Sequence, residues 1–197
     1  MIGIIEMMNK KEIDFDVSAS EKIGLGLLNN HVHFLIGEID EDNIGDTIKW
    51  IVYENMTCGT NIKTLTLYIN STGGSLNDSF ALIDMMRNSK CPIRTVGIGS
   101  ICSAAFMIFS SGSKGQRYIA KNTSIMCHQY SDDIEGKHHD IKSRFKEIEL
   151  TNTRMINILK ENTGLETRTI KSKLLNATDV WLTSEELVEL GIADDYI

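Results

Sequence analysis

Ser103 stands where a predicted strand turns into a predicted helix, a placement that suits nucleophilic catalysis. The apolar, β-branched run at 93–98 predicts a buried strand. Beyond Gly99 and Ser100, which we expect to form the turn, residues 103–109 are almost wholly apolar and predict a core helix. A hydroxyl at a helix N-terminus lies beside free backbone N–H groups that can hold an oxyanion. A serine there is also a common helix cap, so this placement alone leaves catalysis and capping both open.

Two further turns carry residue types that fit the same chemistry. The alternating run at 62–69 predicts a strand that leads into Gly73 and Gly74, where glycine lets the backbone approach a substrate closely. The segment at 122–128 has an apolar run at 125–127 and ends on His128, a residue type suited to general-base catalysis. Each feature also has a purely structural interpretation, as a plain turn and as a core histidine.

Strands and helices alternate along the chain, and this alternation brings the three features together. It predicts an α/β fold of repeated β-α-β units with parallel strands and right-handed crossovers. Ligands bind beyond the carboxyl ends of such strands, so Ser103, the Gly73–Gly74 turn and His128 are expected at one sheet edge. Further elements are expected as a strand at 31–37, helices at 42–56 and 75–88, and a last helix begun by the Thr183 and Glu186 capping box.

A long helix predicted at 137–162 carries one apolar stripe and ends before Gly164. The stripe consists of Ile141, Phe145, Ile148, Met155 and Leu159. A helix this long either crosses the domain or projects from it to pack on another subunit.

Composition limits the possible classes of protein. With 197 residues, 42% of them hydrophobic and 24% charged, the chain is expected to form one soluble globular domain. A net charge of −7 argues against nucleic acid or an anionic membrane as a partner. Four cysteines without C-x-x-C spacing indicate reduced thiols and a cytoplasmic protein. His31 and His33 share one strand face but have no further ligand nearby, so no metal site is predicted.

Four segments taken together resemble the ClpP-type Clp protease family of serine peptidases. They are YINSTGGS at 68–75, GIGSICSAAFMIFSSGSKGQR at 97–117, NTSIMCHQ at 122–129 and DVWLTSEELVELGIAD at 179–194. The resemblance implies a ClpP/crotonase-like fold with a long projecting helix and an assembly of two stacked heptameric rings. It also implies a hexameric ATP-driven unfoldase as partner, unfolded polypeptides as substrates and no cofactor.

Position by position, the resemblance implies a Ser-His-Asp site. The family's nucleophile falls on Ser103, its general base on His128 and its orienting aspartate on Asp179. The oxyanion donors would be the backbone N–H groups of Gly74 and Ala104. Only the resemblance selects this aspartate, because the residues alone leave open Asp132, Asp133, Asp140 and Asp194.

We therefore expect a serine endopeptidase that cleaves unfolded polypeptides inside an oligomeric chamber. Residues 1–197 are expected to form a single peptidase domain, with an N-terminal arm at 1–20 and a projecting handle region at about 130–163. Two alternatives share the fold: a viral capsid-maturation protease that needs no unfoldase, and a catalytically silent ring subunit. A crotonase-like acyl-CoA enzyme is a third, although that class needs no serine at position 103.

Overall fold

The computed structural model describes residues 18–131 and 134–197 and divides the chain at residue 30. In the first unit the described residues form one helix, α1 (Ala19–Asn29). Ser18 caps it, because its side chain accepts a hydrogen bond from the Glu21 N–H while the Glu21 carboxylate accepts one from the Ser18 N–H. The predicted arm at 1–20 lies almost wholly outside the described residues, and the helix that follows it was not predicted.

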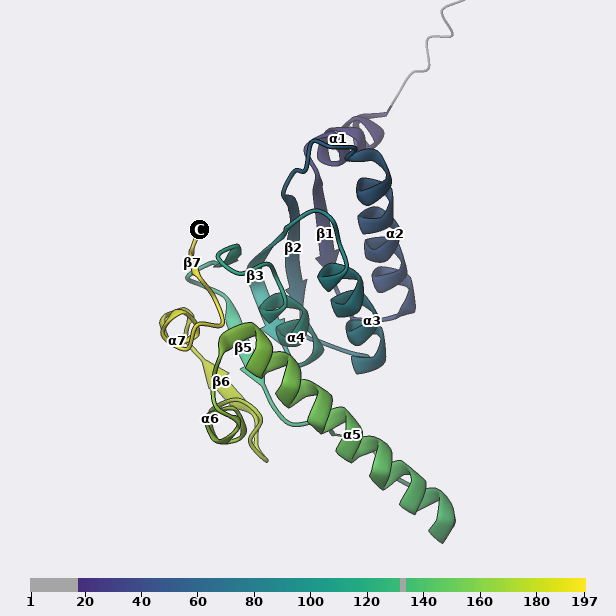
Figure 1. Ribbon diagram of the computed structural model, residues 1–197, viewed down its shortest axis with the longest axis vertical. Helices are drawn as coiled ribbons and strands as arrows, with labels where there is room; N and C mark the ends of the chain where they lie inside the picture. Colours follow the sequence, from purple (N-terminus) through teal and green to yellow (C-terminus); the bar gives the residue numbers. More distant parts are fainter. Residues whose placement is uncertain (1–17, 132–133) are drawn as a thin grey trace, which may run out of the picture. The chain divides into compact units, whose positions relative to one another are not determined.

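The second unit, His31–Ile197, is an α/β structure in which helices alternate with the strands of one sheet (Figure 1). Its elements are β1 (Val32–Ile36), α2 (Glu41–Thr57), β2 (Leu65–Ser71), α3 (Leu76–Arg87), β3 (Ile93–Cys102), α4 (Ala104–Ser110), β4 (Arg117–Ile119), β5 (Ser124–Cys127), α5 (His138–Thr163), α6 (Thr167–Lys173), β6 (Val180–Leu182), α7 (Ser184–Glu189) and β7 (Asp195–Tyr196). The predicted α/β class is confirmed, whereas the single domain over 1–197 stays a prediction.

The sheet is mostly parallel, as the alternation predicted. Its main path runs β1-β2-β3-β4-β7, and β5 pairs in parallel with β3. In the described residues the exception is β6, which pairs antiparallel with β5. Because β1, β2, β3 and β5 all run the same way, their carboxyl ends meet at one edge of the sheet.

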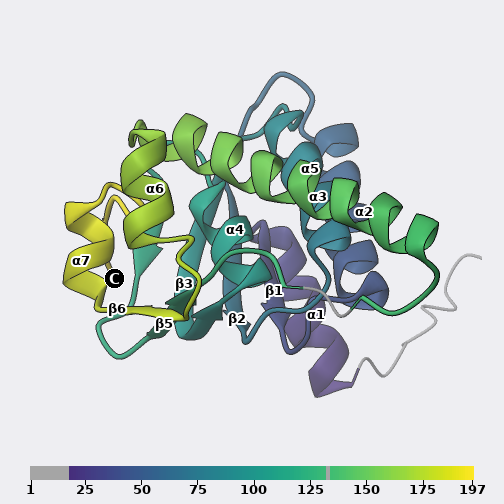
Figure 2. The ribbon, with the colours of Figure 1, turned by 90° about the horizontal axis from the view of Figure 1, so that it is seen from below.

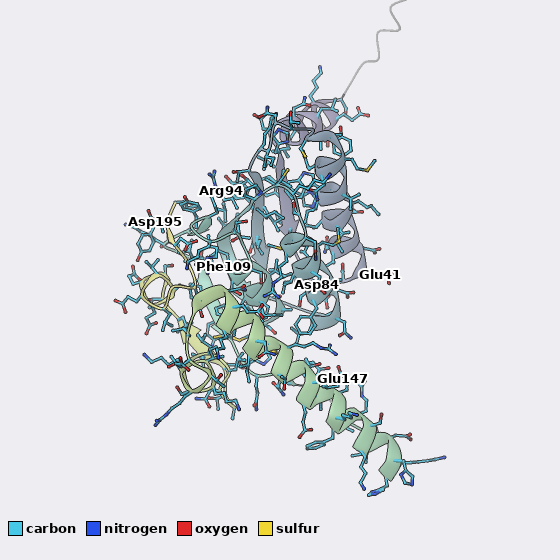
Figure 3. All side chains as sticks on the ribbon, viewed as in Figure 1. Glu41, Asp84, Arg94, Phe109, Glu147 and Asp195 are labelled. Carbon is cyan, nitrogen blue, oxygen red and sulfur yellow. The ribbon has the colours of Figure 1, made fainter. Side chains whose placement is uncertain are left out.

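The core lies between the central strands and the helices that cover them. In β2 the side chains alternate, and Leu65, Leu67 and Ile69 are fully buried. Every residue of α4 is buried, including Phe109, which Figure 3 labels. Figure 2 shows α3 and α5 on the same side of the sheet. A central strand and a core helix packed in this way give the turn between β3 and α4 a rigid frame.

The strand predicted at 93–98 continues to Cys102, so the turn expected at Gly99 and Ser100 is wrong. Asn70 on the neighbouring strand accepts a hydrogen bond from the Ser100 N–H at 3.0 Å, and the β2–β3 register shifts beside this contact. Gly99 has φ +63°, which only glycine adopts without strain, so the strand bulges instead of ending. The chain therefore turns at Ser103.

In the C-terminal third of the chain, the long helix and the last helix were predicted, whereas the short strands were not. Helix α5 spans His138–Thr163 and ends at Gly164 with φ +76°, close to the predicted 137–162. Thr183 and Glu186 form the predicted capping box of α7. The short elements β4, α6, β6 and β7 were not predicted.

Candidate active site

Ser103 occupies a strained turn between β3 and α4. Its φ and ψ are 54° and −120°, a region that costs a residue other than glycine about 1–3 kcal/mol. The turn is held because the Ser103 N–H donates to the Met126 carbonyl at 2.9 Å and because the helix that follows is wholly buried. This geometry presents the Ser103 hydroxyl at the N-terminus of α4, as in the nucleophile elbows of serine hydrolases.

His128 lies directly beyond β5 and reaches the serine. In the parallel β3–β5 pairing, Cys102 is the partner of Met126, so both strands deliver their next residues to the same edge. His128 Nε2 lies 2.8 Å from Ser103 Oγ. A nucleophile and its general base need this contact, with the lone pair on Nε2 and the proton on Nδ1. The structure thus brings the two predicted residues together.

The glycine turn after β2 packs against the serine. A methyl group on Gly73 would lie 2.8 Å from Ser103 Cβ and 3.2 Å from the Ala104 nitrogen, so only glycine fits there. Ser71 Oγ accepts a hydrogen bond from the Gly73 N–H at 3.1 Å and so holds the turn. The positioning role of Ser71 was not predicted, although its place in the N-S-T-G-G turn was a visible signal.

The two predicted oxyanion donors are available. Within residues 18–131 and 134–197, no hydrogen bond uses the backbone N–H of Gly74 or that of Ala104. Ala104 is the first residue of α4, where the helix itself supplies no acceptor. The Gly74 backbone is held by the Ile39 segment, because Ile39 N donates to Gly73 O at 2.9 Å and Ser75 N donates to Ile39 O at 2.8 Å.

Asp179 lies next to His128 along the sheet, but its carboxylate does not bond to the imidazole. In the antiparallel β5–β6 pairing, Cys127 is the partner of Val180, so the next step of that register places Asp179 opposite His128. Asp179 is exposed, and in the described residues no hydrogen bond joins its carboxylate to His128. The structure therefore places the backbones of the predicted triad together and leaves the third side chain in solvent.

The alternative aspartates fit less well. The Asp194 carboxylate is occupied by Arg117, whose Nε and Nη2 donate to its two oxygens at 2.9 and 2.6 Å. Asp140 lies exposed in the first turn of α5. Asp132 and Asp133 lie outside the described residues.

Two thiols lie beside the site. Cys102 and Cys127 precede the serine and the histidine and are both buried. Burial, and secondarily the neighbouring Cys102, raises the pKa of Cys127 to about 12. The Cys127 thiol is therefore neutral near pH 7 and does not compete with the serine as a nucleophile.

His31 and His33, the two histidines that share one strand face, make structural contacts. His31 Nδ1 bonds to Glu54 Oε2 at 2.7 Å, and the His33 ring stacks on Trp50 with centroids 5.1 Å apart. Burial lowers the pKa of His33. The described part of the chain holds no cluster of three or more potential metal ligands, and none of its helices is long and apolar enough for a membrane span.

Comparison with known protein families gives one result that covers the whole site. The family model described as Clp protease matches residues 17–197. The match includes the strand ends that carry Ser103, His128 and Asp179 and the turn that carries Gly74.

Proposed function

Because the chain belongs to the Clp protease family, and is thus a serine endopeptidase of the ClpP type, we propose that Ser103, His128 and Asp179 are its catalytic residues. The observation that carries the proposal is the 2.8 Å contact between His128 Nε2 and Ser103 Oγ, made at a residue with φ +54°. A serine that only caps a helix needs neither the strained turn nor the imidazole.

The geometry suits acyl transfer. His128 Nε2 takes the hydroxyl proton as Ser103 Oγ attacks the peptide carbonyl carbon. The N–H groups of Gly74 and Ala104 hold the negative oxygen of the tetrahedral intermediate. His128 then gives its proton to the leaving amine, and a water activated by the same imidazole hydrolyses the acyl-enzyme.

Asp179 would orient the imidazole from the other side. Its backbone lies one register step from the β5–β6 ladder, so a change of side-chain rotamer can bring the carboxylate toward His128 Nδ1. Hydrogen bonds within a catalytic site often tighten only when substrate binds. We infer that the third member of the triad engages in the substrate-bound, assembled enzyme.

A cavity beside the oxyanion turn offers space for a substrate side chain. It measures about 210 Å³ and its lining includes Gly74, Leu76, Tyr130 and Thr151 together with Glu147, which Figure 3 labels on α5. Because Gly74 would hold the scissile carbonyl, the side chain of that substrate residue would lie next to this cavity.

Membership of the family implies an oligomer that works with ATPase partners. We propose the finer arrangement of two stacked heptameric rings fed by a hexameric unfoldase, located in the cytoplasm. In support, α5 extends beyond the sheet in Figure 1 and exposes 38% of Ile141 and 59% of Phe145. Apolar side chains on an exposed helix are typical of a subunit interface. The inner part of the predicted stripe, Met155 and Leu159, is buried within the subunit.

Labelling with a fluorophosphonate probe tests the catalytic assignment. We expect a single labelled serine, Ser103, and no label in Ser103→Ala. The variant should also lose peptide hydrolysis by a factor on the order of 10⁶, as in other serine triads. Labelling of another serine, or full activity of Ser103→Ala, would contradict the assignment.

A second assay tests the closed chamber. A short fluorogenic peptide should be hydrolysed without nucleotide, whereas a folded, tagged protein should be cleaved only with an unfoldase and ATP. Cleavage of the folded protein by this chain alone would favour the capsid-maturation alternative. No cleavage of either substrate would favour the silent ring subunit.

A further inference from the structure

A cavity lies at the sheet edge opposite the catalytic serine, where β1, β2 and β3 begin. It measures about 210 Å³, and its lining includes His31, Glu54, Cys58, Lys63 and Cys91. None of these residues takes part in the proposed hydrolysis. The cavity therefore gathers two thiols, a carboxylate and two basic side chains that the peptidase reaction leaves without a role.

Hydrogen bonds hold the two thiol-bearing segments together. Cys58 is the C-cap of α2, and its thiol donates to the carbonyl of Asn55 at 3.5 Å. The side-chain oxygen of Asn55 accepts from the Lys90 N–H at 2.9 Å and so ties the end of α2 to the residue before Cys91. The Leu65 N–H donates to the Pro92 carbonyl at 2.9 Å on the other side. The main chain on either side of the two cysteines is thus fixed, and both thiols line one small cavity.

We propose that Cys58 and Cys91 are a dithiol modification site that a low-molecular-weight disulfide, such as oxidised glutathione, converts to an intramolecular disulfide. From the sequence, these cysteines are expected only as reduced thiols. Two of the four cysteines are expected to react, while Cys102 and Cys127, which are buried beside the catalytic residues, are not.

The exposure of the two thiols sets the order of the reaction. Cys58 is half-buried, whereas Cys91 is only 2% exposed, so the oxidant meets Cys58 first. The Cys58 thiolate attacks one sulfur of the oxidant, forms a mixed disulfide and releases the first glutathione thiolate. Cys91 Sγ then attacks Cys58 Sγ and releases the second glutathione. Two electrons pass from the dithiol to the oxidant, and two protons leave the cysteines.

The second step needs a base, because Cys91 is held as a neutral thiol. Burial is the main cause that raises the pKa of Cys91, and the neighbouring Cys58 thiol raises it further. The Glu54 carboxylate lines the same cavity as Cys91, its charge also raises the Cys91 pKa, and it is only 3% exposed. Its Oε2 bonds to His31, but within the described residues its Oε1 has no hydrogen-bond partner. Because a buried carboxylate oxygen without a partner is costly, Oε1 is available to accept the Cys91 proton.

A chain of contacts holds that carboxylate in place. Lys63 Nζ lies 2.9 Å from His31 Nε2, and as an ammonium group it can only donate. The His31 proton is therefore on Nδ1, which donates to Glu54 Oε2 at 2.7 Å. Glu54 is a positioning and proton-accepting residue for this step, and its other oxygen is left for the thiol.

Thiol counting and peptide mapping of the full-length assembled protein test the proposal. After treatment with oxidised glutathione, we expect the count to fall from the four cysteines of the chain to two, with a cross-linked peptide that joins Cys58 to Cys91. Cys102→Ser is the matched control. Its count should fall by the same two thiols, and the same Cys58–Cys91 peptide should form. Four thiols that remain free in the folded protein, a cross-link between subunits, or a Cys102–Cys127 link would each overturn the proposal.

Variants separate the two steps. Cys91→Ser should stop at one glutathione adduct on Cys58, and Cys58→Ser should acquire no adduct at position 91. Glu54→Gln should leave the first step unchanged and slow the second by about a hundredfold, the lower end for general-base catalysis. Equal second-step rates in Glu54→Gln and wild type, with equal circular dichroism spectra, would remove Glu54 from the proposal. These readouts do not involve peptide hydrolysis, so they stand apart from the proposed function.

Discussion

Replacement of Gly73 by alanine tests whether the glycine turn and the serine form one rigid site. The added methyl group would lie 2.8 Å from Ser103 Cβ and 2.9 Å from the Cys102 carbonyl oxygen, both closer than van der Waals contact. Gly73 has φ +106°, which also disfavours any side chain. The substitution therefore perturbs the backbone of the turn and the position of Ser103, the proposed nucleophile, together.

The expected loss of folding stability is the sum of a backbone cost and a packing cost. The backbone conformation costs about 1–3 kcal/mol, and overpacking against a buried neighbour costs about 1–3 kcal/mol more. The total of roughly 2–6 kcal/mol is less than the stability of most domains, so the variant should fold with a lower Tm. A displaced serine or oxyanion donor costs about 10²–10³ in kcat. We expect kcat to fall by that factor with little change in KM.

Gly164→Ala is the matched control. Gly164 also has a positive φ, +76°, but a methyl group there would have no heavy atom within 4 Å. This control should lower the free energy of unfolding by about 1–2 kcal/mol and leave kcat unchanged. The assays are thermal unfolding and steady-state hydrolysis of a fluorogenic peptide. If Gly73→Ala matched the control in both kcat and Tm, the close packing of Gly73 against Ser103 would be refuted.

Three further substitutions test other parts of the structure. Asp179→Asn should lower kcat by a factor of about 10⁴ if the carboxylate orients His128, and an unchanged kcat would remove Asp179 from the proposed triad. Phe145→Asp should reduce the particle mass in light scattering, and an unchanged mass would exclude this side chain from the proposed contact between rings. Burial raises the pKa of Asp194, but the hydrogen bonds and charge of Arg117 outweigh it and hold that pKa below its usual range. The pKa of Asp194 is lower in the folded protein than in the unfolded chain. Its ionised carboxylate therefore stabilises the fold fully above the unfolded-state pKa, and this stabilisation is lost as the pH falls through the folded-state pKa. Asp194→Asn should therefore be less stable than wild type at pH 7 and nearly equal to it in strong acid by denaturant unfolding; equal stability at pH 7 would contradict this.

The sequence was sufficient for the parts of the site that depend on local pattern and topology. Apolar runs that end in glycine, serine and histidine place Ser103, His128 and the Gly73–Gly74 turn at strand ends. A parallel sheet then brings strand ends to one edge. The structure has these residues in contact through the His128–Ser103 hydrogen bond and the packing of Gly73.

Other features depend on contacts that no local pattern carries. The turn was placed at Gly99 and Ser100 because glycine and serine favour turns, but the Asn70 side chain keeps that segment in the sheet. The position of Asp179 near His128 depends on a strand of three residues, β6, whose pairing with β5 sets the register. Helix α1, by contrast, had a readable signal in the Ser18-x-x-Glu21 capping box.

The two edges of the sheet hold their thiols in different environments, and this difference separates the two proposed reactions. At the carboxyl edge, Cys127 is buried, has a pKa of about 12 and lies in the strand before His128, so we expect it to stay reduced. At the amino edge, Cys58 is half-buried, and Cys91 lines the same cavity as Glu54, whose Oε1 has no partner in the described residues. A bond between them would join the end of α2 to the start of β3, and the ten residues of that buried strand separate this point from Ser103. Closing this loop restricts mainly the unfolded chain. Oxidation should therefore raise the Tm and leave the geometry of the Ser103 turn unchanged.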